Sequence, residues 1–211
     1  WLHPSFWRVS AGPFNVLQQG SLYYVDLDND SIADDDEGPI VVVETSENGV
    51  IDTSNEYLYI DTRGNDRFDY QEGDRWLVGV DANEDGVISL PDEDVMLLGE
   101  PKVAMILDQY SGNVYVRGVN LTTDALFVGD QNGHGTHVAS IIAGGQPGYT
   151  DMVGVAPGAN LLVIRSPLMT SDIIEAVFFA IENGADIINM SFSSFLGFLD
   201  GTDIELSLIH I

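Results

Sequence analysis

The chain of 211 residues contains no cysteine, so it forms no disulfide and offers no thiolate to a metal ion. It has no run of 18 or more apolar residues, so no membrane-spanning helix is predicted. Basic residues are scarce: 7 stand against 34 acidic ones, for a net charge of -27. Such a surface repels nucleic acid and anionic membranes and attracts cations. Nucleic acid is therefore excluded as an expected partner, while a hydrophobic content of 45% suffices for a packed core.

The two ends of the chain lack the features of a complete open reading frame. The chain starts with Trp1 instead of methionine and has no signal peptide, so we interpret it as an internal fragment. We treat residues 1–19 as an N-terminal remnant. The last residues, 206–211, resemble a translated adapter from sequencing libraries, and we leave them out of functional reasoning.

Acidic residues concentrate between Asp26 and Glu100, a stretch that holds 23 of the 34. Four short runs of β-branched, aromatic and other apolar residues alternate there with acidic loops, at 22–25, 40–43, 57–60 and 76–80. Runs of this kind predict strands, and the polar loops predict turns. We therefore predict an all-β region of consecutive hairpins over residues 20–101.

The loop that starts at Asp81 has the best calcium-binding pattern. Oxygen ligands stand at loop positions 1, 3 and 5, a glycine at 6, a backbone carbonyl at 7, and further oxygens at 9 and 12. The candidate ligands are Asp81, Asn83, Asp85, Val87, Ser89 and Asp92. The pattern resembles an EF-hand or dockerin loop and predicts a structural calcium ion. The alternative is a tight turn that only carries surface charge.

A second loop offers carboxylates in the same frame, at Asp26, Asp28, Asp30, Asp34 and Glu37. Ser31 replaces the glycine at position 6, so this is the weaker calcium candidate. The loop from Asp61 carries Arg63 at a ligand position, and the loop from Glu44 fits less well still. We expect these last two loops to act only as turns.

After Glu100 the pattern changes to alternating strands and helices. Apolar runs at 103–107, 161–164 and 185–190 predict buried strands. Helices are predicted at 134–144 and 170–183, the second with a capping box at Asp172 and Glu175 and with Gly184 just past its end. Strand, helix and strand in this order imply a parallel sheet. We predict a partial α/β domain over residues 102–205.

Three motifs in this half are the most specific features of the sequence. They are GHGTHVASIIAG at 133–144, GVAPGANLLVIR at 154–165 and GADIINMSFSS at 184–194. In this order and spacing they resemble the subtilisin-like serine peptidases. The predicted fold class is therefore α/β, an incomplete subtilisin-like parallel sheet with flanking helices, plus the all-β acidic hairpin repeat as an insertion. Tripeptidyl-peptidase II-like and archaeal subtilases carry insertions at the same place.

The resemblance implies a polypeptide substrate and a role for specific residues. His134 takes the place of the general base, and Ser191, Phe192 and Ser193 take the place of the strand that pairs with the substrate backbone. A position at a helix N-terminus helps to keep a histidine base neutral, because the helix dipole disfavours the imidazolium form. The serine motif of the family has no match, so we expect the chain as given to be inactive. We place the triad aspartate upstream of Trp1, ahead of Asp52 or Asp108.

Several alternatives stay open at this point. A zinc site at His134 and His137 is disfavoured, because no glutamate lies between them as in HExxH helices. The chain could instead be a non-enzymatic calcium-binding module of the dockerin or adhesion type, fused to a degenerate α/β domain. Within the family, an exopeptidase like tripeptidyl-peptidase II is the alternative to an endopeptidase. We expect a secreted protein, with a salt-rich cytoplasm as the alternative, and the sequence leaves the oligomeric state open.

Overall fold

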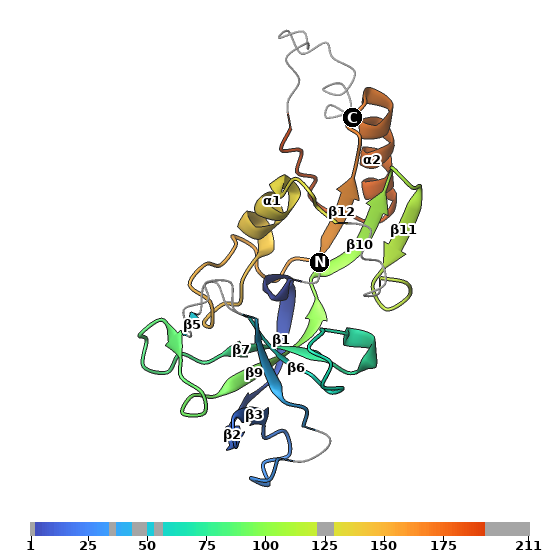
Figure 1. Ribbon diagram of the computed structural model, residues 1–211. Helices are drawn as coiled ribbons and strands as arrows, with labels where there is room; N and C mark the ends of the chain where they lie inside the picture. The colour runs from blue at the N-terminus through green and yellow to red at the C-terminus, as the bar shows by residue number, and fades with distance from the viewer. Residues whose placement is uncertain (1–2, 34–36, 44–49, 53–56, 122–128, 193–211) are drawn as a thin grey trace. The chain divides into compact units, whose positions relative to one another are not determined.

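The structure is a computed structural model, and it describes residues 3–33, 37–43, 50–52, 57–121 and 129–192 (Figure 1). Its contacts divide the chain into two units. Unit 1 comprises Trp1–Lys102, Thr122–Leu126 and Asp130–Ala159, and unit 2 comprises Val103–Leu121, Phe127–Gly129 and Asn160–Ile211. The segment around His134 thus groups with the β-rich region. The domain boundaries at 19, 101 and 205 stay a prediction, because grouping by contacts does not show which segment is inserted.

Unit 1 is built on a five-stranded antiparallel sheet in the order β1-β9-β7-β6-β4. The strands are β1 (Trp7–Phe14), β4 (Ile40–Val43), β6 (Tyr57–Ile60), β7 (Arg75–Gly79) and β9 (Val95–Pro101). The predicted runs at 40–43 and 57–60 form strands over those residues, and the run at 76–80 begins one residue earlier. Smaller pairs join β2 (Val16–Gln19) to β3 (Leu22–Val25) and β5 (Ile51–Asp52) to β8 (Val87–Ile88).

Both faces of this sheet are covered, because side chains on a strand alternate between its two faces. One face carries an aliphatic core that includes Leu58, Ile60 and Leu77. The opposite face carries an aromatic core of Trp7, Tyr59 and Trp76 together with Leu98. Burial on both faces explains why the strand runs are continuously apolar instead of alternating.

The N-terminal residues, which we expected to be a remnant, are an integral part of unit 1. After the short helix η1 (Pro4–Phe6), strand β1 pairs with β9, and Trp7 at its start is completely buried. Phe68 and Tyr70, near the helix η2 (Tyr70–Glu72), contact Trp7 edge to face with ring centroids 6.2 and 4.9 Å away. This segment therefore completes the aromatic core.

Unit 2 contains a three-stranded sheet in the order β11-β10-β12 and the helix α2 (Thr170–Glu182). Strand β10 (Val103–Asp108) pairs in parallel with β12 (Leu161–Arg165) and antiparallel with β11 (Asn113–Val116). The predicted parallel pairing of the runs at 103–107 and 161–164 is thus confirmed. Gln109 donates from Nε2 to the carbonyl of Asp172 at 2.9 Å, which ties the end of β10 to the first turn of α2.

Two local predictions in unit 2 are wrong. Residues 185–190 form no strand, and Ile187 is 88% exposed, because no strand among the described residues supplies the hydrogen-bonded neighbour that a strand needs. Helix α2 has Met169 at its N-cap with no side-chain cap, so Asp172 lies inside the first turn and forms no capping box. At the other end Gly184 takes φ 78° just past the helix, as expected. No helix in the described part of the chain is long and apolar enough to cross a membrane.

Candidate functional site

Helix α1 (His134–Ala143) begins at the candidate general base. Gly133 at the N-cap takes φ 80°, a left-handed conformation that glycine adopts without a steric penalty. It has no side chain with which to cap the helix. His134 is exposed, so its ring is accessible from solvent in unit 1. His137 lies one turn further on and donates its backbone N–H to the Gly133 carbonyl at 2.9 Å.

Asp130 supplies the missing cap from three residues before the N-cap. One carboxylate oxygen accepts from the N–H groups of Asn132 and Gly133, at 3.2 and 3.0 Å, and the other accepts from Thr136 N–H at 2.7 Å. The hydrogen bond from Thr136 is the main cause that lowers the pKa of Asp130. The negative charge at this helix end offsets part of the dipole that we expected the imidazole to meet. Sequence reasoning missed Asp130, although an acid shortly before a predicted helix is a recognisable cap signal.

The C-terminal end of α1 is bound by the segment that contains the second motif. Gly154, Val155 and Ala156 donate their N–H groups to the carbonyls of Gly144, Ile141 and Ile142, at 2.8, 3.0 and 2.7 Å. A Cβ atom on Gly154 would lie 2.7 Å from the Ala143 nitrogen, so only glycine allows this approach. The glycine at the start of GVAPG is therefore required by packing against the helix.

Lys102 binds the remaining carbonyls at this end of α1. Its side chain is 1% exposed, and Nζ donates to the carbonyls of Ala143 and Gly145 at 2.7 and 2.5 Å and to that of Ser5 at 3.3 Å. Burial, followed by the charge of Arg8, lowers the pKa of Lys102 to about 8. A cation at a helix C-terminus also interacts favourably with the helix dipole. Helix α1 is therefore held at both ends, while its first residue stays accessible.

The residues expected to line the substrate groove are only partly described. Ser191 and Phe192 are exposed, and the Asn189 amide donates to Ser191 Oγ at 2.9 Å. Ser193 lies outside the described residues. The groove assignment stays a prediction.

Asp108 and Asp52 are the two aspartates named as alternatives for the triad. Asp108 ends β10 and is buried; it forms an ion pair with Arg165 at 3.1 Å and accepts from Ser111 Oγ at 2.6 Å. These partners already account for its carboxylate. Asp52 pairs with Val87 through the β5–β8 ladder.

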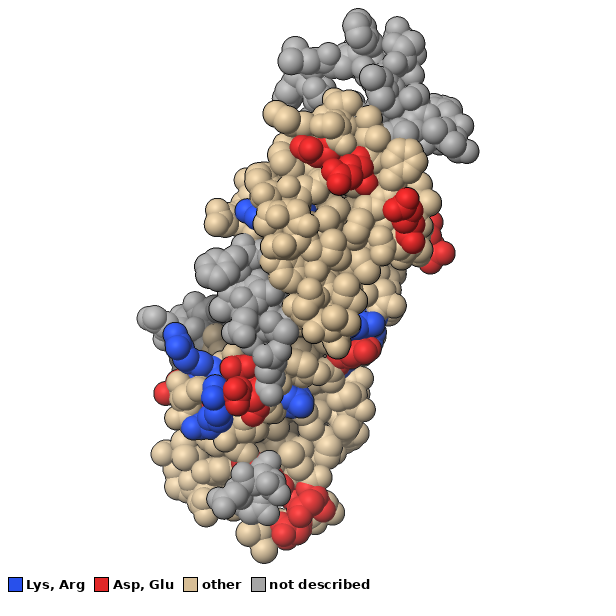
Figure 2. Space-filling view, turned by 90° about the vertical axis from the view of Figure 1, so that its right-hand side faces the viewer, with Lys and Arg blue, Asp and Glu red and all other residues tan. Residues whose placement is uncertain are grey.

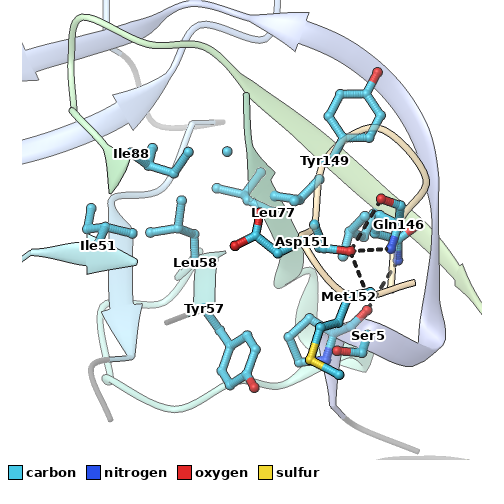
Figure 3. A pocket seen from close by; sticks show the side chains of 15 residues that line it. Ser5, Ile51, Tyr57, Leu58, Leu77, Ile88, Gln146, Tyr149, Asp151 and Met152 are labelled. Carbon is cyan, nitrogen blue, oxygen red and sulfur yellow. Dashed lines mark hydrogen bonds between the residues drawn. The ribbon is translucent and has the colours of Figure 1, made fainter. Parts of the chain in front are cut away.

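A small cavity of about 100 Å³ lies in unit 1 between the sheet and the loop that follows α1 (Figure 3). Leu58, Leu77 and Ile88 line it from the strands, and Gln146 and Asp151 line it from the loop. Pockets for small-molecule ligands measure roughly 300–1,000 Å³. This cavity is therefore too small to serve as a substrate site.

Three acidic loops of unit 1, which begin at Asp26, Asp61 and Asp81, share two left-handed positions and one closing hydrogen bond. Loop positions are counted from these aspartates. Positions 4 and 6 are left-handed in every loop: φ is 63° and 64° at Asn29 and Ser31, 63° and 55° at Gly64 and Asp66, and 59° and 83° at Glu84 and Gly86. In each loop a buried carboxylate at the far end accepts the N–H of position 2; these closing residues are Glu37, Asp74 and Glu93. Three of the four sequence repeats thus share these features, and the loop from Glu44 lies outside the described residues.

The carboxylates of the Asp81 loop accept hydrogen bonds from backbone N–H groups of the same loop. Asp81 accepts from the N–H groups of Asp85 and Gly86 at 3.1 and 2.7 Å, and Asp85 accepts from Val87 N–H at 2.9 Å. The residue that closes the loop by hydrogen bonds is not the ligand predicted at position 12, whose role stays a prediction. Asp92 is exposed, and its neighbour Glu93 accepts from Ala82 and Ser89 N–H at 3.0 and 2.8 Å.

The Asp61 loop carries its own positive charge. Arg63, at position 3, forms ion pairs with Asp69 and Glu72 at 3.4 and 3.5 Å. Burial, followed by the nearby charges of Asp61, Asp74 and Asp66, raises the pKa of Tyr59 to about 12. On the face in Figure 2, several of the basic groups in the lower half of the view lie directly beside acidic atoms.

The Asp26 loop is the place where the described residues gather three carboxylates that could hold one metal ion. Ligand oxygens of Asp26, Asp28 and Asp30 all lie within 4.8 Å of one another. Glu37 closes the loop and accepts from Leu27 N–H at 2.6 Å. The fourth expected ligand, Asp34, lies outside the described residues.

Comparison with known proteins agrees with the histidine motif and the motifs that follow it. Residues 41–206 match the model of the subtilase family, peptidase family S8. The chain belongs to the subtilase family. No solved structure matches it.

Three curated proteins show how much of this subtilase chain its relatives share. A thermophilic serine proteinase of Bacillus sp. (strain AK1) is 39% identical over 67 residues, 29% of this chain and 17% of that protein. Pyrolysin of Pyrococcus furiosus is 34% identical over 117 residues, 38% of this chain and 8% of that protein. An intracellular serine protease of Paenibacillus polymyxa is 45% identical over 67 residues, 29% of this chain and 20% of that protein. The chain thus spans a fifth or less of the length of each.

Proposed function

We propose that the chain is the histidine-bearing part of a subtilisin-like serine endopeptidase and that His134 is its general base. The observation that carries the proposal is the placement of His134. It is exposed at the first residue of a helix whose two ends are fixed by Asp130, by Lys102 and by the N–H groups of 154–156. A general base needs a fixed backbone and a ring that a substrate can approach. The relatives named as serine proteinases support the same reaction class.

In this reaction His134 takes the proton from a serine hydroxyl as its oxygen attacks the scissile carbonyl. The imidazolium that forms then gives the proton to the leaving amine, and a water molecule repeats the cycle to release the acyl group. The nucleophile has no candidate in this sequence, so we propose that the chain by itself does not hydrolyse peptides. Ser191, Phe192 and Ser193 would pair with the substrate backbone.

We place the triad aspartate upstream of Trp1. The ion pair of Asp108 with Arg165 and its hydrogen bond from Ser111 support a structural role for that residue. The acidic loops would then lie in an insertion between the aspartate and the histidine.

We also propose that the Asp81 loop binds a structural calcium ion through Asp81, Asn83, Asp85, the Val87 carbonyl and Ser89. The exposed Asp92 would contribute only after a local rearrangement. A polar hollow of about 430 Å³ joins Asp81 and Asp85 to Asp151, in the loop that follows α1. A bound ion would therefore stabilise the region next to the histidine helix by mass action.

The test uses the full-length protein that contains this chain. His134→Ala should lower kcat by about 10⁴-fold or more, which is the usual cost of losing the base of such a triad. His137→Ala is the matched control, since it lies on the same helix and should leave most of the activity. Circular dichroism should show that both variants keep their helix content. Full activity in His134→Ala would overturn the proposal.

A further inference from the structure

The Asp26 loop brings like charges together, and the structure records no ion pair to them from any residue that it describes. Asp28 and Asp30 are exposed, whereas Asp26 is 2% exposed, and ligand oxygens of the three lie within 4.8 Å of one another. Carboxylates this close repel one another, and the repulsion is strongest where water is excluded. A bound cation removes this repulsion, and hard oxygen ligands of this kind favour calcium.

The decisive observation is a buried oxygen of Asp26. Its Oδ1 accepts from Asp30 N–H at 3.1 Å, but among the described residues no donor contacts its Oδ2, which is fully buried. In the loops at Asp61 and Asp81 the corresponding oxygen accepts the N–H of position 6. Asp61 Oδ2 accepts from Asp66 and Asp81 Oδ2 accepts from Gly86, both at 2.7 Å. A buried carboxylate oxygen without a donor is costly, so the part of the Asp26 loop that is described leaves a place for a further partner at this oxygen.

We propose that the Asp26 loop holds one calcium ion through Asp26 Oδ2 and carboxylate oxygens of Asp28 and Asp30. Water and backbone carbonyls would complete the six to eight oxygens that calcium prefers. The Asp61 loop differs in both respects, because Asp61 Oδ2 has a donor and position 3 is Arg63, which forms ion pairs with Asp69 and Glu72. The proposal is independent of the peptidase activity of the chain, since it concerns a loop that does not include His134.

Isothermal titration of this chain with calcium, in about 0.15 M NaCl to screen weak surface binding, tests the proposal. Asp85→Asn is the parent for the titration, because it weakens the Asp81 loop. This parent should bind one equivalent of calcium. Adding Asp28→Asn should weaken that binding by about tenfold or more, because a charged ligand is lost. Adding Asp66→Asn, the matched control in the Asp61 loop, should leave the affinity unchanged.

Amide NMR spectra locate the ion independently of the variants. Calcium should shift the resonances of Leu27 and Asp30 and leave those of Arg63 and Asp66 in place. The proposal is overturned if the parent binds no calcium, or if Asp28→Asn titrates like the parent. It is equally overturned if the shifts do not include the Asp26 loop. Asp28 is exposed, so its substitution tests the ligand without disturbing the buried Asp26.

Discussion

The loops at Asp26 and Asp61 share several backbone features and balance their charge in different ways. Both are left-handed at positions 4 and 6, and both end in a buried carboxylate that binds the N–H of position 2. At position 3 one loop has Asp28 and the other has Arg63. The Asp61 loop satisfies its first carboxylate internally, whereas the Asp26 loop leaves an oxygen without a donor in the described residues. Similar loops therefore differ both in the donors to their first carboxylate and in the charge at position 3, and the proposed calcium ion would account for the difference.

Lys102 is a second basic residue whose charge is placed beside oxygen atoms, in this case the carbonyls of a helix. It is the one lysine in the sequence, and it is buried where helix α1 ends. Like Arg63, it supplies a positive charge from within the chain to a set of oxygen atoms. The site differs in burial, since the Arg63 side chain is 45% exposed and Lys102 is 1% exposed. An internal cation should therefore matter more at Lys102 than at Arg63.

The largest effect is expected for Lys102→Met. This change leaves the carbonyls of Ala143 and Gly145 without their donor in a buried place. An unsatisfied buried group costs about 1–3 kcal/mol, so the free energy of unfolding should fall by about 2–4 kcal/mol. Urea unfolding measures this. Arg67→Met removes one exposed charge and should change stability by less than about 0.5 kcal/mol. Equal effects in the two variants would contradict a special role for the buried cation.

The free energy of unfolding of the parent and of Lys102→Met should also depend on pH in different ways. The pKa of Lys102 is lowered from 10.5 to about 8, so between these values the unfolded chain binds more protons than the folded one. Stability should therefore rise with pH from about 8 to about 10.5 in the parent, and Lys102→Met should lack this rise. Tyr59 acts in the opposite direction above pH 10, because its pKa is raised to about 12. The comparison is best made below pH 10.

A smaller effect is expected when the two loops are made alike at position 3. Arg63→Asp removes two ion pairs and adds a carboxylate beside Asp61 and Asn65, which stand at positions 1 and 5. Without calcium the variant should lose about 1–2 kcal/mol of stability. With calcium at 100 times the Kd, it should recover about 2.7 kcal/mol, and titration should count one additional site.

Arg67→Asp is the control for this exchange. It changes the net charge by the same amount from a position that holds no ligand side chain in the loop frame. It should add no calcium site. If both variants bind calcium equally, general charge and not the loop frame decides the affinity. If neither does, the Asp61 frame cannot accept an ion.

The strand pattern of unit 1 was predictable because it is local. Runs of β-branched and aromatic residues form β3, β4 and β6 over the predicted residues. Strand β1 was not predictable, because its hydrophobic positions are interrupted by Gly12 and Pro13 and its partner β9 lies far along the chain. The strand predicted at residues 185–190 is absent for the opposite reason. Their composition favours a strand, but a strand forms only beside a neighbour that accepts its hydrogen bonds.

The candidate site was predictable where a motif fixed it and not where long-range contacts did. The His134 motif and the helix that starts there followed from the sequence. Lys102 could not be found, since its three carbonyl partners come from residues 5, 143 and 145. The buried carboxylate that closes the Asp81 loop, Glu93, follows the predicted ligand Asp92 directly, and the role of Asp92 stays a prediction. Glu37, Asp74 and Glu93 stand at positions 12, 14 and 13, so the path of the chain sets the closing position and a fixed spacing does not.

The smallest expected effect concerns position 6, where the Asp26 loop has Ser31 and the Asp81 loop has Gly86. Both are left-handed, with φ 64° and 83°. A residue with a Cβ pays about 1 kcal/mol for this conformation, so Ser31→Gly should stabilise the chain by up to about 1 kcal/mol and Gly86→Ser should destabilise it by about as much. A Cβ on Gly86 would meet no atom within 4 Å, so backbone strain alone is measured. Asn29→Gly is the control, because asparagine tolerates the left-handed region and should gain less. If Asn29→Gly gained as much as Ser31→Gly, the strain would not be specific to position 6.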